Sequence, residues 1–184
     1  MSKVATRCPV LSIKTNMLYD LALTPNIAAE IGIGRKWSVS AGFMCGWWLS
    51  RDWSFCWQAE AAEVEVRYWL GRSEYRPALT GWFVGTFAAS GFYDFQLKRT
   101  EGVQGKLKFT GGISGGYAYR LGQRWRLELL LGVGYLLSDY HRYTVAQNGD
   151  KLVLLNSGSA KRLKAFFPLK AGVSLAWIIN TNRT

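Results

Sequence analysis

The residues between Trp125 and Leu137 alternate between two kinds of side chain. Every second residue, starting with Trp125, is apolar, and an aromatic residue lies near each end of this series. The residues between them begin with Arg126 and Glu128 and continue with leucine and glycine. Because successive side chains of a strand point to opposite faces, the pattern predicts a strand with one apolar face and one crowded, partly charged face. A usual strand has roughly 5–6 residues, whereas a tilted strand that crosses a bilayer needs about 9–11, so the run favours a membrane-spanning strand.

Seven further segments resemble this strand, although one of them, at 81–97, shows no clear alternation because its aromatic residues occur in adjacent pairs. Turn-forming residues separate the segments. Glycine is frequent, at 20 residues, and aromatic residues make up 15% of the chain, a combination that fits closed β-structure better than a helical bundle. The eight predicted strands are 12–23, 27–33, 37–49, 55–70, 81–97, 106–120, 125–140 and 166–179.

The connections between these strands fall into two groups. Those at 34–36, 71–80 and 121–124 are short or moderate, whereas those at 98–104 and 142–164 are longer and polar. Short turns at one rim and long loops at the other are typical of outer-membrane barrels, which in bacteria have an even number of strands. We therefore predict an all-β fold, an eight-stranded antiparallel up-and-down transmembrane β-barrel with both termini periplasmic.

Closure of this barrel requires the first strand, over 12–20, to pair with the last, over 169–179. We expect residues 142–164 to form a long extracellular loop that holds a small hairpin at 151–155. Residues 1–9 lack the apolar central region of a signal peptide, so we predict a disordered N-terminal extension, and the barrel hypothesis requires that a signal has been removed or replaced. The 184 residues are then a single domain.

Aromatic residues gather near the ends of the predicted strands, as in the two aromatic girdles of a membrane barrel. A soluble barrel with aromatic residues in its core is the alternative, but its aromatic residues need not be sorted toward the strand ends. We therefore favour the membrane interpretation. The predicted girdle on the short-turn side comprises Trp37, Tyr68, Trp69, Trp82, Tyr119, Trp125 and Trp177, and that on the loop side comprises Tyr19, Trp47, Trp57, Phe92, Tyr93, Phe109, Tyr135 and Phe166.

The chain carries a formal net charge of +11, for which nucleic acid is the usual partner to consider. Its basic residues are scattered or lie in predicted loops, and no nucleic-acid-binding motif is present, so an anionic membrane surface explains the charge better. No apolar window of about 18 residues is free of charge, so no membrane-spanning helix is expected. Of the three cysteines, Cys45 and Cys56 flank one turn, where they either face each other or are small buried residues, the interpretation we favour. We expect neither a metal nor a cofactor, because no metal-binding spacing is present.

The predicted inner faces carry seven charged residues. Eight strands enclose only enough space for side chains, and an unpaired buried charge is very costly, so these residues must pair with one another. We interpret them as a structural network that specifies closure and register, and a path for protons or ions is the alternative. The predicted network comprises Lys14, Glu30, Glu63, Glu65, Arg67, Glu128 and Lys170.

The single histidine, His141, follows Ser138 and Asp139 at the loop-side end of its strand. A histidine that titrates near neutral pH, beside a hydroxyl and a carboxylate, is the arrangement that small barrel enzymes use to act on lipid A or phospholipid. Asp94 or Ser90 would complete such a site. A solvated histidine at the rim explains these common residues more simply, and we favour it.

Basic residues also gather on the loop side of the predicted barrel. An anionic outer leaflet rich in lipopolysaccharide would offer them phosphate groups, although a solubilising loop surface needs the same residues. The predicted contact with lipopolysaccharide involves Lys98, Arg99, Lys161, Arg162 and Lys164, and Lys106, Lys108 and Lys151 lie on the same side.

Several runs of the sequence resemble the DUF3575 family of Bacteroidetes proteins, in the family's order and over most of the chain. The resemblance implies a small outer-membrane β-barrel with a cleaved signal, often encoded beside fimbrillin-type and other surface-assembly genes, and it brings no catalytic motif. The chain departs from the family in its 142–164 loop and its N-terminus. The most specific run is SIKTNMLYDLALTPNIAAEIGIGRKWSV (12–39), and the others are VEVRYWLG (64–71), YDF (93–95), LGVGY (131–135) and KAGVSLAWII (170–179).

These observations favour a non-enzymatic protein of the Gram-negative outer membrane with a structural or surface-interaction role, accessory to the assembly of fimbriae or adhesins. The expected partners are outer-membrane lipid, including lipopolysaccharide, and surface fimbrial or adhesin proteins, with no nucleic acid, and the barrel is expected to be a monomer. The alternative function is a small lipid-modifying enzyme, an acyl hydrolase or transferase, that uses His141. The filled, polar interior disfavours a pore and a carrier of apolar ligands.

Overall fold

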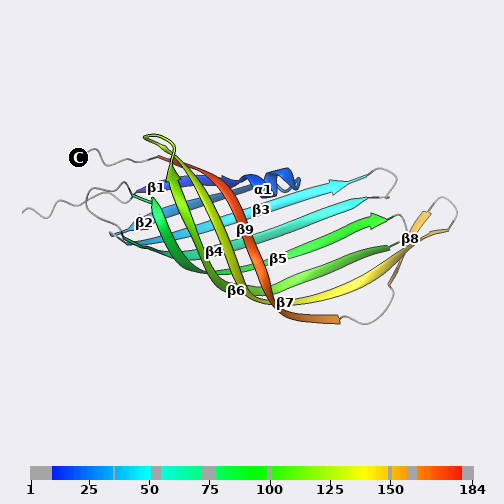
Figure 1. Ribbon diagram of the computed structural model, residues 1–184. Helices are drawn as coiled ribbons and strands as arrows, with labels where there is room; N and C mark the ends of the chain where they lie inside the picture. Colours follow the sequence, from blue (N-terminus) through cyan, green and yellow to red (C-terminus); the bar gives the residue numbers. More distant parts are fainter. Residues whose placement is uncertain are drawn as a thin grey trace, which may run out of the picture.

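The structure, a computed structural model, describes residues 10–34, 36–50, 55–71, 78–98, 101–148, 151–156 and 161–179. Within these ranges the chain forms nine strands and one short helix (Figure 1). No helix there is long and apolar enough to cross a membrane. The elements are β1 (Leu11–Asn16), α1 (Met17–Leu21), β2 (Asn26–Ile33), β3 (Trp37–Leu49), β4 (Cys56–Trp69), β5 (Gly81–Lys98), β6 (Glu101–Arg120), β7 (Trp125–Asn148), β8 (Lys151–Asn156) and β9 (Lys161–Ile178).

Eight of the strands, β1 to β7 and β9, form one antiparallel sheet that closes in a ring. Each strand from β1 to β7 pairs with the next along the chain, and β9 pairs with both β7 and β1. The first and last strands of the ring are joined from Ser12, opposite Ile178, to Asn16, opposite Ser174. The predicted set of eight antiparallel up-and-down strands, with the first paired to the last, is therefore confirmed.

The ring is much taller on one side than on the other. Strand β1 has 6 residues, whereas β6 has 20 and β7 has 24. Strands β3 to β7 therefore continue beyond the ring as an open, curved sheet (Figure 1), and β8 extends this sheet by pairing with the last residues of β7. We call the end of the molecule that this open sheet forms the extended end. The opposite end, which holds the turns near 34–36 and 121–124 and both ends of the described chain, is the short-turn end.

Two segments that were predicted to be polar loops consist largely of strand. Strand β5 runs to Lys98 and β6 begins at Glu101, so the ladder takes up most of the segment 98–104. Most of the segment 142–164 belongs to β7, β8 and β9, and the hairpin predicted at 151–155 is β8 paired with β7. The prediction failed here because both segments are rich in polar residues and lack the alternation that marks a half-buried strand.

The first strand is shorter than predicted, because the chain leaves the sheet at Asn16 and forms α1. The side chain of Asn16 accepts a hydrogen bond from the backbone N–H of Leu18 and so caps the helix. The same amide donates a hydrogen bond to Ala171 O at 3.1 Å and accepts one from Val173 N at 3.2 Å. These two bonds take the place of the backbone hydrogen bonds that a further residue of β1 would make with β9. Asparagine side chains compete for backbone hydrogen bonds in this way, and alternation of polarity does not show it.

Burial of the side chains follows the predicted alternation in β4, β7 and β9. In β7, Glu128 and Leu130 are buried, whereas Leu129 and Leu131 are 52% and 71% exposed. In each of these strands the charged face therefore points into the ring and the apolar face points outward.

A bulge in β6 changes the face of one residue. Leu107 pairs with Ser138 and Phe109 pairs with Leu137, so Lys108 is an extra residue in β6. Ser138 is buried inside, and Leu107, which pairs with it, therefore lies on the inner face, whereas Phe109 lies on the outer one. The faces of β5, which the sequence left open, are now assigned, since Phe83 and Phe87 are buried while Trp82 and Val84 are exposed.

A small hydrophobic cluster fills the short-turn end of the ring. Trp69 belongs to it and is fully buried, and its indole N–H donates to Ser38 Oγ at 2.8 Å. The predicted place of Trp69 in the outer girdle is therefore wrong, because this residue shares the inner alternation of Arg67 in β4. The cluster comprises Trp69, Leu79, Phe83, Ala118, Leu130 and Ile178.

Three further aromatic residues of the predicted girdles turn inward: Tyr93 and Trp57 at the extended end, and Tyr19, which lies in α1 and lines a cavity inside the ring. Tyr93 bonds through its hydroxyl to the buried Ser138, at 3.0 Å between oxygens. Trp57 follows the inner alternation of β4, and its ring lies 4.6 Å from that of Phe95, centroid to centroid. Other predicted members stay outside, among them Trp37, Trp47, Trp82, Tyr119, Trp125, Phe109, Tyr135 and Phe166.

Cys45 and Cys56 do not face each other. Cys45 lies opposite Glu60 and Cys56 lies opposite Leu49, so four residues of strand, about 13 Å, separate the two cysteines. Both thiols are free, and a disulfide needs Cα atoms within about 7 Å. Cys8 and the rest of the predicted N-terminal extension lie outside the described residues.

Candidate functional site

Arg67 of β4 lies at the centre of a buried charge network. Its guanidinium nitrogens lie 2.8 Å from Glu65, 2.9 Å from Glu128 and 3.3 Å from Glu30, measured to the nearest carboxylate oxygen. These four side chains are at most 2% exposed. The carboxylates come from β4, β7 and β2, so one guanidinium joins three separate strands of the ring.

Two lysines complete the network, one from β1 and one from β9, the two strands that close the ring. Each lysine bridges two carboxylates, so each ammonium has two anionic neighbours. The structure thus brings together all seven residues of the predicted network, and each of its carboxylates has at least one cationic partner. The lysine contacts are Lys14–Glu30 (2.6 Å), Lys14–Glu128 (3.2 Å), Lys170–Glu65 (2.8 Å) and Lys170–Glu63.

Two buried serines, which the sequence analysis missed, also belong to the network. Ser38 Oγ donates to Glu30 Oε1 and Ser114 Oγ donates to Glu65 Oε1, both at 2.5 Å. A signal for Ser38 was present, because the inner alternation of neighbouring strands places it directly opposite Arg67. These hydroxyls satisfy carboxylate oxygens that the cations do not bind.

Aromatic and glycine residues shape the space around the cations. The guanidinium carbon of Arg67 lies 4.3 Å from the ring centroid of Phe83, and Lys170 Nζ lies 5.2 Å from that of Phe87. Gly132 lies opposite Lys170 in the register of β7 and β9. A Cβ at Gly132 would come within 3.0 Å of the Cβ of Lys170 and 3.1 Å of the Phe87 ring, so glycine leaves room for the lysine.

A cavity of about 160 Å³ lies beside the network, lined in part by Lys170, Glu63, Phe87 and Tyr19 of α1. It is smaller than the roughly 300–1,000 Å³ of most ligand pockets, and its lining contains no histidine or cysteine. In the described part of the chain, no three His, Cys, Asp or Glu side chains lie close enough together to hold a metal ion. What the arrangement offers chemically is a set of matched charges that connects the strands across the interior.

The residues around His141 do not meet in one site. Ser138 is 1% exposed and faces the interior, where its hydroxyl donates to Lys106 O at 3.1 Å and bonds to the hydroxyl of Tyr93. Asp139 and His141 lie on the other alternation of β7, which faces outward. The sheet therefore separates the serine hydroxyl from the imidazole.

Asp94 is also placed apart from the histidine. It accepts hydrogen bonds from Tyr143 Oη at 2.7 Å and from Gln104 Nε2 at 3.1 Å. Gln104 lies between Asp94 and His141 in the register, so two strand spacings, about 10 Å, separate their backbones. Burial raises the pKa of Asp94, although the bonds from Tyr143 and Gln104 partly offset this. Ser90, the other candidate, donates to a backbone carbonyl of β6 at 3.0 Å.

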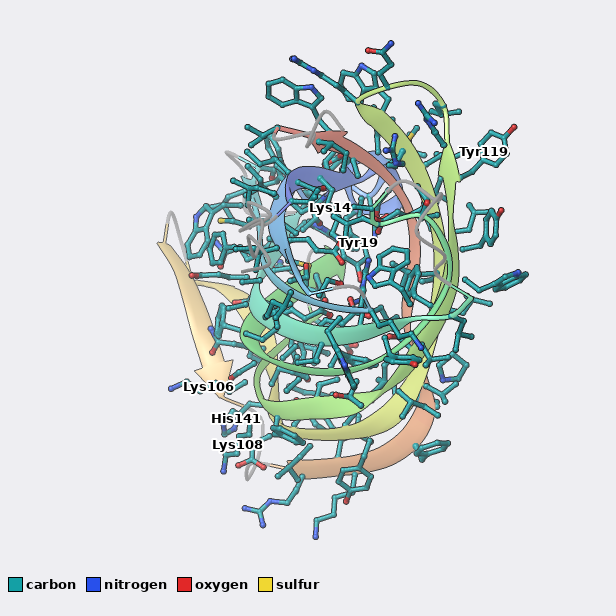
Figure 2. The ribbon with its side chains drawn as sticks, turned by 90° about the vertical axis from the view of Figure 1, so that its left-hand side faces the viewer. Lys14, Tyr19, Lys106, Lys108, Tyr119 and His141 are labelled. Atoms are coloured by element: carbon teal, nitrogen blue, oxygen red, sulfur yellow. The ribbon has the colours of Figure 1, made fainter. Side chains whose placement is uncertain are left out.

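Basic residues gather around Asp139 on the outer face of the extended end, where Figure 2 shows Lys106 and Lys108 on the same side as His141. Lys108 Nζ lies 2.6 Å from Asp139 Oδ2, and Arg162 Nε lies 3.1 Å from Asp139 Oδ1. The hydrogen bonds from Lys108 and Arg162 hold the pKa of Asp139 below its usual range. Lys106 and Arg162 both pair with Asp139 in register, and Lys164 follows two residues along β9. We call Lys106, Lys108, Arg162 and Lys164 the basic cluster.

The other predicted basic residues lie on the opposite face of the sheet or outside the described part of the chain. Lys161 is exposed, but it alternates with Arg162 and so belongs to the other face of β9. Arg99 and the side chains of Lys98 and Lys151 lie outside the described part. The basic cluster therefore contains two of the five predicted lipopolysaccharide contacts, Arg162 and Lys164.

Fold and site together define a closed, up-and-down, all-β protein with a charged interior. The chain belongs to the family described as Protein of unknown function (DUF3575), whose family model matches residues 1–179. This confirms the family resemblance found in the sequence. No match was found among curated proteins or among solved structures.

Proposed function

We propose that the protein is an eight-stranded transmembrane β-barrel of the Gram-negative outer membrane, with a non-enzymatic structural or surface-interaction role. The proposal rests on an inverted pattern of burial, in which polar side chains are buried and large apolar side chains are exposed. Among the described residues, 10 hydrophobic residues are buried against 17 polar or charged ones, and 33 large hydrophobic residues are exposed. A water-soluble domain buries its apolar side chains and exposes them only in small patches. A lipid environment accounts for both the exposed apolar surface and the charged interior.

The height of the apolar surface supports the same proposal. In β7 the outer face is apolar or aromatic from Trp125 to Tyr135. Ten residue steps span about 33 Å along a strand, or about 23 Å along the membrane normal at a tilt of about 45°. Outer-membrane barrels have an apolar band about 25 Å tall with aromatic residues at both edges. Trp82 and Trp125 would mark one edge, and Phe109 and Phe166 the other.

The two ends of the molecule suggest how it is oriented and what it contacts. The short-turn end would face the periplasm, as short turns do in such barrels, and the extended end would project outside the cell. Outer-membrane lipid, including lipopolysaccharide, would surround a monomer. The open sheet of the extended end is the surface that we assign to fimbrial or adhesin proteins.

Heat-modifiability tests the membrane proposal. The protein is refolded in detergent micelles, and samples with and without boiling are compared by electrophoresis and by circular dichroism. We expect the unboiled protein to migrate faster and to show a β-type spectrum, because a closed barrel resists dodecyl sulfate until it is heated. A chain that folds and stays monodisperse in buffer without detergent would contradict the proposal.

A further inference from the structure

We infer that the basic cluster, Lys106, Lys108, Arg162 and Lys164, binds the phosphate groups of membrane lipids. The inference rests on the proposed membrane location and identifies the lipid chemistry that the outer face recognises. The four residues come from β6 and β9, the two neighbours of β7 in the ring. Three adjacent strands therefore form the floor of one site.

The cluster has an excess of positive charge. Its four cations surround one carboxylate, Asp139, so the net charge of the group is +3. Lys108 and Arg162 share Asp139, whereas Lys106 and Lys164 make no side-chain hydrogen bond or ion pair within the described part of the chain. An anion from outside the protein would balance this charge.

The cations also keep unused hydrogen-bond donors. Arg162 contacts Asp139 through Nε alone, which leaves both terminal nitrogens free among the described residues to bind a phosphate in the bidentate manner that guanidinium favours. Lys108 uses one ammonium contact of the three that it can make. These two side chains are 58% and 47% exposed, so an external phosphate can reach them.

The bulge in β6 links the cluster to the apolar surface. Because Lys108 is an extra residue, it and the adjacent Phe109 are both exposed, at 47% and 51%. A cation therefore lies next to an aromatic residue at the edge of the apolar band. A lipid binds such a pair with its phosphate on the lysine and its upper chain segment against the ring.

The height of the cluster matches the lipid phosphates. Along β9, Lys164 and Arg162 lie two and four residues beyond Phe166, about 7 and 13 Å along the strand. At a tilt of about 45° these distances become about 5 and 9 Å along the membrane normal. The headgroup region extends about 5–8 Å beyond the hydrocarbon on each side of a bilayer. The backbone of Lys164 thus lies within the headgroup region and that of Arg162 about 1–4 Å beyond it, a distance that its long side chain spans, which favours a lipid over a free anion.

Native mass spectrometry of the protein released from dodecyl maltoside micelles tests the inference. The micelles contain dioleoyl phosphatidic acid or dioleoyl phosphatidylcholine at the same mole fraction, and the bound lipids are counted. The test variant is Lys108→Gln/Arg162→Gln. The control variant, Arg120→Gln/Arg124→Gln, removes the same charge from two exposed arginines at the short-turn end.

We expect the wild type to prefer phosphatidic acid, and the test variant to bind it about 30-fold less tightly, since the variant loses two direct contacts with the phosphate and each is worth roughly fivefold. The control should lose less than about threefold. An equal loss of affinity in both variants would show that only the net charge of the protein matters and would overturn the inference. Equal binding of the two lipids by the wild type would also overturn it. Inorganic phosphate that displaces the lipid at micromolar concentration would overturn the lipid as the source of the phosphate.

Heat-modifiability of the same samples separates this inference from the proposed function. A test variant that still shows the boiling-dependent shift but loses its lipid preference supports the inference. A wild type that shows the shift but no preference overturns the inference alone. A wild type that shows no shift overturns the membrane proposal first, and the inference with it.

Discussion

The chain holds two clusters of basic and acidic side chains that use the same chemistry at different depths. In the interior network, Arg67 and its three carboxylate partners are at most 2% exposed. In the basic cluster, Lys108 and Arg162 are about half exposed while they share Asp139. Both clusters use a shared carboxylate, yet the first balances nearly all its charges internally and the second does not.

The difference follows from the cost of removing a charge from water. An unpaired charge inside a protein costs several kcal/mol, so every charged residue of the interior network must find its partners within the ring. An exposed pair contributes about 0–1 kcal/mol, so nothing forces charges at the surface to balance. Burial thus makes the first cluster a structural connection between strands, and exposure leaves the second with free donors for a ligand.

The largest effect is expected from Arg67→Met. The change leaves Glu30, Glu65 and Glu128 without their common cation, and removal of one partner from a buried pair costs about 3–5 kcal/mol. Urea unfolding of the detergent-refolded protein, followed by the loss of the fast-migrating form, measures the change. Arg120→Met, which removes an exposed arginine at the short-turn end, is the control. Equal stability of the two variants would mean that the interior network does not hold the ring together.

Lys170→Met should have a smaller effect, about 2–3 kcal/mol. Glu65 would keep its contacts with Arg67 and Ser114, and Glu63, at 31% exposed, can be solvated from the cavity. The same urea titration measures this variant beside Arg67→Met. A loss of stability as large as that of the arginine variant would show that Arg67 is not the main cation of the network and that Lys170 contributes equally to stability.

Ser114→Ala should cost less again, about 1.5 kcal/mol, because it removes one hydrogen bond to a charged group while the cations of Glu65 stay in place. Ser90→Ala is a matched control, since Ser90 is an exposed hydroxyl that donates to a backbone carbonyl of β6. The two unfolding midpoints are compared at pH 7. Identical midpoints would remove Ser114 from the network.

The smallest effect is expected from Asp139→Asn in the basic cluster, a slight decrease in the unfolding midpoint at pH 7. Hydrogen bonds from Lys108 and Arg162 lower the pKa of Asp139 in the folded state below its ordinary value of 3.8. The carboxylate therefore stabilises the fold above pH 3.8, and this contribution disappears as the pH falls through the lower, folded-state pKa.

Unfolding midpoints of the wild type and of Asp139→Asn at pH 6 and pH 2.5 check the sign. The wild type should lose slightly more stability than the variant between these two values, because only the wild type has the carboxylate to protonate. A variant that loses more than the wild type would show that Asp139 is not held ionised by its basic neighbours.

Much of the fold and of the interior network could be predicted because both depend on side-chain alternation. In β7, the positions of Glu128 and Leu129 on opposite faces follow from a period of two, and the need to pair buried charges then groups residues far apart in the chain. The prediction failed for Trp69 because its aromatic character was given more weight than its alternation, which placed it inside. Alternation was the better guide, because the pleat of a strand depends on the backbone and not on the residue type.

Alternation could not reveal features that depend on hydrogen bonds between distant segments. Asn16 ends β1 because its amide bonds to both the helix N-terminus and the edge of β9, and no local pattern shows this. The bulge at Lys108 likewise appears only when β6 is aligned with β7. The lengths of β6, β7 and β9 were underestimated because their residues beyond the ring are largely polar and do not alternate.

The sequence by itself determined that the chain forms eight antiparallel strands, most of them with one apolar face and one charged or small-residue face, because that pattern repeats locally along most of the chain. Only the tertiary structure decided which charges pair, where the sheet opens beyond the ring, and which basic residues surround Asp139. Which charges pair, and which basic residues surround Asp139, depends on the register between strands. A shift of one residue would move every side chain to the opposite face, and the register is set by contacts that only the closed ring brings together.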